Sequence, residues 1–148
     1  MNILFLCTGN SCRSQMAEGW SKRLAPKTWK ITSAGIEEHG KNPYAIKVMA
    51  EAGTNISNQE STRLTDEMLI QADLVITVCG HADEHCPVLP AGTRKEYWPL
   101  DNPAKASGTV DEILDVFRAT RDEVHRRVKD LIARECPSNL EVSDEYAI

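Results

Sequence analysis

The chain has 148 residues, of which 41% are hydrophobic and 26% are charged, and its formal net charge is −5 at pH 7. This length and composition predict one globular domain with a core of its own, and the acidic balance argues against a nucleic-acid partner, which needs a basic face. The apolar stretches are too short to span a bilayer, so we expect no membrane partner.

Short apolar runs alternate with segments of helical periodicity along the chain. The apolar runs predict strands at 2–6, 29–33, 74–78 and 94–98. The helical pattern predicts helices at 14–25, 43–52, 65–71 and 110–134. Because strand and helix alternate, we expect an α/β fold, with an open parallel sheet of about four strands flanked by helices on both faces. Ligands of such sheets bind beyond the carboxyl ends of the strands.

The expected domain covers residues 1–136. Residues 137–148 are polar and acidic without periodicity, which predicts a flexible C-terminal tail. The first residues contain no basic region followed by a long apolar run, so a secretory signal is not expected. We therefore expect a cytoplasmic protein, with a monomer as the default.

A loop with an unusual composition directly follows the first predicted strand. Its residues are, in order, Cys7, Thr8, Gly9, Asn10, Ser11, Cys12, Arg13 and Ser14. A loop between a strand and a helix N-terminus directs successive backbone N–H groups at one spot, which predicts an oxyanion bound by residues 8–13. The same partial charge and the Arg13 guanidinium favour a nucleophilic Cys7 thiolate at neutral pH. A buried structural cysteine is the alternative, but the full spacing favours the nucleophile.

A second group of sulfur and imidazole side chains follows the third predicted strand. It spans residues 79–87 and holds Cys79, His81, His85 and Cys86. Three interpretations stay open: a zinc site, a buried strand-end cysteine beside a polar helix, or a redox pair of Cys79 and Cys86. If residues 80–89 form a helix, the two cysteines are about 10.5 Å apart along its axis. Bridged Cα atoms lie roughly 4.4–6.8 Å apart, so a disulfide would require residues 80–85 to unwind.

These segments resemble the thioredoxin-coupled arsenate reductases, which are built on the low-molecular-weight tyrosine phosphatase fold. The resemblance rests on residues 7–19, on the stretch 33–36, and on Cys79 with Cys86 and Pro87, and it extends to about residue 134. The pattern of a cysteine, five residues, an arginine and a serine fits phosphatases equally. The extra cysteine pair is what favours the reductase.

The resemblance implies a relay of thiols without a tightly bound cofactor or a metal. Arsenate would bind to the loop and Arg13, Ser14 would donate a hydrogen bond to Cys7, and Cys7 would attack arsenic. Cys79 would then attack the Cys7 sulfur and release arsenite, and Cys86 would attack Cys79. Thioredoxin would reduce the final disulfide. The alternative function is a low-molecular-weight protein tyrosine phosphatase, which hydrolyses phosphomonoesters through a Cys7 phosphocysteine.

The chain departs from the family pattern at the general acid. The family usually has an aspartate directly before a proline, whereas here Asn102 precedes Pro103. An amide cannot deliver a proton, so we expect Asp101 to serve as the acid, with water as the alternative. Some relatives also hold a potassium ion, which would lie here near Asn10, Glu18 and Ser33.

Overall fold

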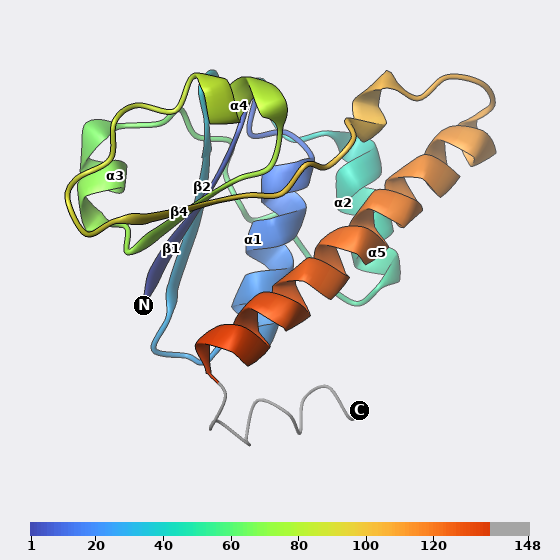
Figure 1. Cartoon of the computed structure of the whole chain (residues 1–148). Coiled ribbons are helices and arrows are strands. Elements are labelled where there is room, and N and C mark those ends of the chain that lie inside the picture. Colours follow the sequence, from blue (N-terminus) through green and yellow to red (C-terminus); the bar gives the residue numbers. More distant parts are fainter. Residues whose placement is uncertain (137–148) are drawn as a thin grey trace.

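The computed structural model describes residues 1–136 (Figure 1). The flexible tail expected at 137–148 lies outside the described residues. Within them, the strands are β1 (Asn2–Cys7), β2 (Lys30–Gly35), β3 (Leu74–Thr77) and β4 (Arg94–Tyr97). The helices are α1 (Arg13–Leu24), α2 (Pro43–Glu51), α3 (Asp66–Gln71), α4 (Gly80–Glu84) and α5 (Val110–Glu135), with a 3-10 turn η1 (Pro103–Lys105).

The strands form one parallel sheet in the order β2-β1-β3-β4, which confirms the expected architecture. The central strands β1 and β3 are apolar and almost wholly buried, as parallel strands covered on both faces are. Leu6 pairs with Thr77, and the Val78 N–H donates to the Leu6 carbonyl at 2.9 Å. The chain therefore leaves β1 and β3 side by side at one edge, where Cys7 and Cys79 lie.

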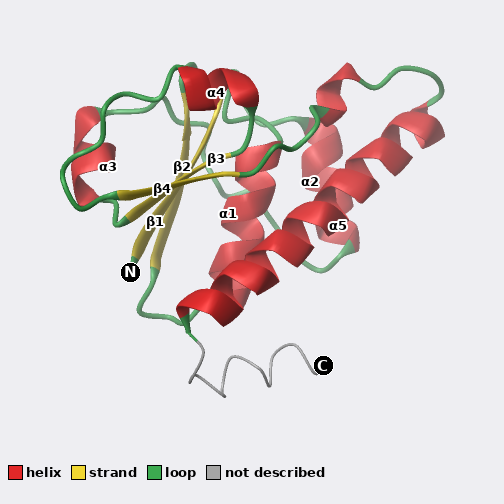
Figure 2. Cartoon of the chain, viewed as in Figure 1, coloured by secondary structure: helices red, strands yellow, loops and turns green. Residues whose placement is uncertain are grey.

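Helices cover both faces of this sheet (Figure 2). α1, α2 and α5 lie together on one face, α3 lies on the other, and α4 lies over the carboxyl ends of the strands. α5 begins at a capping box made by Thr109 and Glu112. Its buried stripe consists of Leu114, Phe117, Val124, Val128, Leu131 and Ile132. No helix within residues 1–136 is long and apolar enough to cross a membrane.

The helix that follows Cys79 is much shorter than the 80–89 segment considered from the sequence. α4 ends at Glu84, and Cys86 lies two residues beyond it. Pro87 accounts for this end, because a proline disfavours helical backbone at the residue before it. A rearrangement that joins Cys79 to Cys86 would have to unwind this short helix.

β2 is two residues longer at its end than the sequence predicts. Ala34 and Gly35 continue the ladder by pairing with Leu6 and Cys7. Small residues have weak strand propensity, so this extension gives little signal in the sequence. Beyond Gly35, the N–H of Glu37 donates to the Thr8 carbonyl at 2.8 Å, so the segment after β2 supports the loop after β1.

Gly35 is a point of close approach between these two segments. A Cβ atom placed on Gly35 would lie 2.1 Å from the Glu37 carbonyl oxygen, 2.7 Å from the Asn10 nitrogen and 2.8 Å from the Thr8 carbonyl oxygen. All three are backbone atoms, which cannot move aside as a flexible side chain does. The absence of a side chain at residue 35 therefore allows the loop to adopt its shape.

Replacing Gly35 with alanine is expected to lower the free energy of unfolding by roughly 1–3 kcal/mol, the usual cost of overpacking. Gly80→Ala is the matched control, because its Cβ would meet the Tyr97 hydroxyl at 3.6 Å, an ordinary contact. Urea unfolding of both variants measures the difference. A Gly35→Ala protein as stable as the wild type would contradict the close approach.

Candidate active site

The Cys7 sulfur lies at the end of β1, where two donors converge on it. The Asn10 backbone N–H donates to Cys7 Sγ at 3.1 Å, and Ser14 Oγ lies 2.8 Å from the same sulfur. Ser14 Oγ also accepts a hydrogen bond from the Asn10 side-chain amide at 2.8 Å, which leaves its own hydroxyl proton free for Cys7. Two hydrogen-bond donors therefore face the sulfur that the sequence pattern singles out as the nucleophile.

Asn10 fixes the shape of the loop. Its backbone has φ of 51°, in the left-handed region that asparagine tolerates better than most residues. The side chain is fully buried, and its amide donates to Ser33 Oγ at 2.9 Å, in addition to Ser14. Its carbonyl oxygen accepts the Thr62 N–H at 2.7 Å. These bonds hold the residue in a conformation that would otherwise be costly.

The buried polar network continues from Ser33 toward α1. The Ser33 hydroxyl donates to Glu18 Oε1 at 2.5 Å, and the other carboxylate oxygen of Glu18 is paired with the Lys22 ammonium. Asn10, Glu18 and Ser33 are thus adjacent, as expected. The Lys22 ammonium is thus the charged partner of Glu18 in this network.

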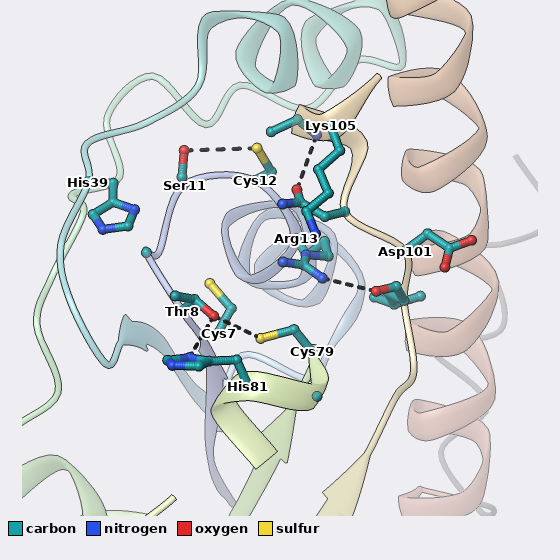
Figure 3. A pocket seen from close by; sticks show the side chains of 15 residues that line it. Cys7, Thr8, Ser11, Cys12, Arg13, His39, Cys79, His81, Asp101 and Lys105 are labelled. Carbon is teal, nitrogen blue, oxygen red and sulfur yellow. Dashed lines mark hydrogen bonds between the residues drawn. The ribbon is translucent and has the colours of Figure 1, made fainter. Parts of the chain in front are cut away.

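Arg13 is the first residue of α1 and directly follows the loop. Its Nη1 donates to the Leu100 carbonyl at 2.9 Å, which ties the guanidinium to the segment before η1. The loop and Arg13 line an open pocket of about 720 Å³, and both Cys7 and Cys79 lie on its wall (Figure 3). The structure therefore brings two of the three predicted relay cysteines to one pocket.

Cys79 occupies the junction of β3 and α4. It is the N-cap of α4, and its Sγ accepts the Ala82 N–H at 3.3 Å. The Thr8 hydroxyl lies 3.2 Å from Cys79 Sγ and 3.1 Å from His81 Nδ1 (Figure 3). The sequence singled out His81 only as a zinc ligand. Its place beside Thr8 follows from the register of β1 and β3, which the sequence does not reveal.

Cys86 lies apart from this pocket, half-buried after the end of α4. Burial raises the pKa of its thiol, Asp83 raises it further, and Lys95 lowers it. The net effect raises the pKa of the Cys86 thiol, which disfavours its thiolate in this conformation. All five cysteines of the chain lie within residues 1–136, and each is unpaired there.

Cys12 shares the loop with Cys7 but has a different environment. Burial raises the pKa of its thiol to about 11, although a hydrogen bond with the Ser11 side chain lowers it somewhat. Its side chain points away from Cys7 and toward Ser11 (Figure 3). A thiol that stays protonated at neutral pH contributes to packing rather than to nucleophilic attack.

The predicted acid, Asp101, lies on the rim of the pocket with its carboxylate turned away from Cys7 (Figure 3). Asn102 is the N-cap of η1, since its side-chain oxygen accepts the Ala104 N–H at 3.1 Å. Lys105 and His39 also line the pocket, and nothing in the sequence pattern indicated them. A proton from Asp101 would therefore require its side chain to rotate.

His81 of α4 and His85, which directly follows the helix, do not converge with the cysteines on a common point. Their rings stack on each other, with 4.2 Å between ring centroids. Among the described residues, no group of three or more His, Cys, Asp or Glu side chains is arranged to hold a metal ion. The geometry of residues 79–86 therefore offers no support for the zinc interpretation.

Comparison with known proteins relates this site to one family. A sequence model of the low molecular weight phosphotyrosine protein phosphatase family matches residues 2–142. The chain is 54% identical to an arsenate reductase of Halalkalibacterium halodurans over 127 residues, which cover 86% of this chain and 91% of the relative. It is 52% identical to an arsenate reductase of Bacillus subtilis over 128 residues, with 86% and 92% covered.

A solved structure described as an arsenate reductase in the phosphate binding state has the same fold. It superposes with a TM-score of 0.74 at 38% identity and covers 90% of this chain and 97% of its own. The resemblance seen in the sequence is thus confirmed over most of the chain. The protein belongs to the low molecular weight phosphotyrosine protein phosphatase family.

Proposed function

We propose that this protein reduces arsenate to arsenite by passing electrons through Cys7, Cys79 and Cys86 in turn. Relatives about half identical over 86% of the chain are named arsenate reductases, and this likeness confirms the reductase activity expected from the sequence. The observation that carries the thiol relay is the second cysteine on the pocket wall, since Cys79 faces the same space as Cys7.

In the first step, the backbone N–H groups of residues 8–13 and the Arg13 guanidinium bind the arsenate oxygens. The Cys7 thiolate attacks arsenic, a sulfur–arsenic bond forms, and one oxygen leaves as water. Arsenic remains in the +5 state at this stage. The departing oxygen needs a proton, which Asp101 supplies after its side chain turns into the pocket.

In the second step, Cys79 attacks the Cys7 sulfur. The Cys7–arsenic bond breaks and its electron pair stays on arsenic, which goes from +5 to +3 and leaves as arsenite. A disulfide between Cys7 and Cys79 remains. The Ala82 N–H and the Thr8 hydroxyl, both within 3.3 Å of Cys79 Sγ, stabilise the attacking thiolate.

In the third step, Cys86 attacks Cys79 and frees Cys7. α4 must open for this, and it is a helix of only five residues. It is held by the buried side chain of Ala82 and by Asp83, whose Oδ1 accepts the Thr77 hydroxyl at 2.9 Å and lies 2.9 Å from Lys95 Nζ. The Lys95–Asp83 pair is partly exposed, so it adds only about 0.2–1 kcal/mol to the cost of opening. The new disulfide then lies near the surface, where cytoplasmic thioredoxin reduces it.

Hydrolysis of phosphomonoesters is the second candidate function, because the family model and the loop with Cys7 and Arg13 suit it equally. A phosphatase would use Cys7 alone and would leave Cys79 and Cys86 without a task. It would also need a general acid, and Asp101 would have to serve there as it does in the reductase. The extra pair of cysteines is therefore what favours the reductase.

Replacing Cys79 or Cys86 with serine is expected to lower steady-state turnover at least about 1000-fold, because each change removes a nucleophile that no other group replaces. The assay follows arsenate-dependent oxidation of NADPH with thioredoxin and thioredoxin reductase. Cys136→Ser is the matched control, since Cys136 follows α5 at its far end, away from the pocket. Unchanged turnover in Cys79→Ser and Cys86→Ser proteins would contradict the relay and favour the phosphatase.

Ser14→Ala is expected to lower kcat/KM for arsenate roughly 10- to 100-fold, because a hydrogen bond to a charged group is worth about 1.5–3 kcal/mol. Ser21→Ala on the same helix is the control. Its hydroxyl is buried and makes no hydrogen bond among the described residues, so its loss should leave the kinetics unchanged. Equal kcat/KM for both variants would show that Ser14 does not stabilise the Cys7 thiolate.

A further inference from the structure

A chain of three polar atoms connects Cys79 to the surface of the protein. Thr8 Oγ1 lies between Cys79 Sγ at 3.2 Å and His81 Nδ1 at 3.1 Å (Figure 3). Cys79 is only 5% exposed, whereas His81 is an exposed side chain. A buried sulfur is thus linked to a solvent-accessible imidazole through a single hydroxyl group.

The hydrogen bonds that link Cys79, Thr8 and His81 can be satisfied in two protonation states. A hydroxyl group can donate one hydrogen bond while it accepts others. When Cys79 is a thiol, its S–H donates to Thr8 Oγ1 and the Thr8 O–H donates to a neutral His81 Nδ1. When Cys79 is a thiolate, His81 Nδ1–H donates to Thr8 and Thr8 donates to the sulfur. The three heavy atoms need not move between these states.

We propose that His81 is a positioning residue and proton acceptor that draws the proton of Cys79 through the Thr8 hydroxyl before Cys79 attacks Cys7. This inference rests on the proposed thiol relay. The Cys79 proton passes to Thr8 Oγ1 while the Thr8 hydroxyl proton passes to His81 Nδ1. The thiolate then forms the bond to the Cys7 sulfur, the Cys7–arsenic electron pair stays on arsenic, and the exposed His81 ring releases its proton to solvent.

The other charged groups near His81 do not reach Cys79 in this way. On α4, Asp83 is engaged by Lys95 of β4 and by Thr77. His85 stacks on the His81 ring, and its Nδ1–H donates to the His81 carbonyl at 2.8 Å. Across the pocket, the titratable groups of the loop, of the segment after β2 and of the segment around η1 are Arg13, His39, Asp101 and Lys105.

The test uses the full chain with Cys86→Ser, so that the reaction stops at the Cys7–Cys79 disulfide. Protein is mixed with one equivalent of arsenate, quenched in acid at successive times and analysed by mass spectrometry across a range of pH. His81→Asn is compared in this background, because asparagine keeps a polar atom near Thr8 but does not titrate. His85→Asn, at the C-cap of the same helix, is the matched control, since it removes the stacked ring without touching Thr8.

We expect His81→Asn to slow disulfide formation on the order of 100-fold at neutral pH, the usual effect of losing a general base. The difference in rate between His81→Asn and its parent should shrink toward about pH 9.5, where thiols ionise without a general base. His85→Asn should follow the profile of the parent. A His81→Asn protein with the parent's rates, or with the same deficit at every pH, would overturn the inference. Failure of the parent itself to form the disulfide would instead overturn the relay.

Discussion

The site depends on the contacts that hold Asn10 in a left-handed conformation. With this residue in place, its own N–H and the Ser14 hydroxyl both face Cys7 Sγ. The side chain of Asn10 connects the loop to Ser33 on β2 and to Thr62, so that the sheet and a distant segment share in fixing the loop. The loop is thus preorganised for an anion, and its donors need no rearrangement when one binds.

The parallel register of β1 and β3 brings Cys79 to the pocket that holds Cys7. Because Leu6 pairs with Thr77, the residues that follow each strand end in the same pocket. Cys79 caps a helix of five residues, and Cys86 follows where Pro87 has ended it. The oxyanion loop and this short helix therefore follow adjacent strands, and each serves a different step of the proposed reaction.

Much of the fold and part of the site could be predicted from the sequence. The apolar runs gave the strands and the parallel sheet, and the spacing of Cys7 and Arg13 indicated an oxyanion loop, because these signals are local. The contact of His81 with Thr8 depends on pairing between distant segments, which no local pattern reveals. The direction of the Asp101 side chain is likewise set by tertiary structure. Its carboxylate is turned away from Cys7, whereas a proton donor would have to face the pocket (Figure 3).

The most direct measurement of the central claim is peptide mass mapping of disulfides in wild-type protein quenched after one equivalent of arsenate, without thioredoxin. The account predicts a bridge between Cys79 and Cys86 with Cys7 returned to a free thiol. Release of arsenite without that bridge, or a bridge confined to Cys7 and Cys12, would contradict it.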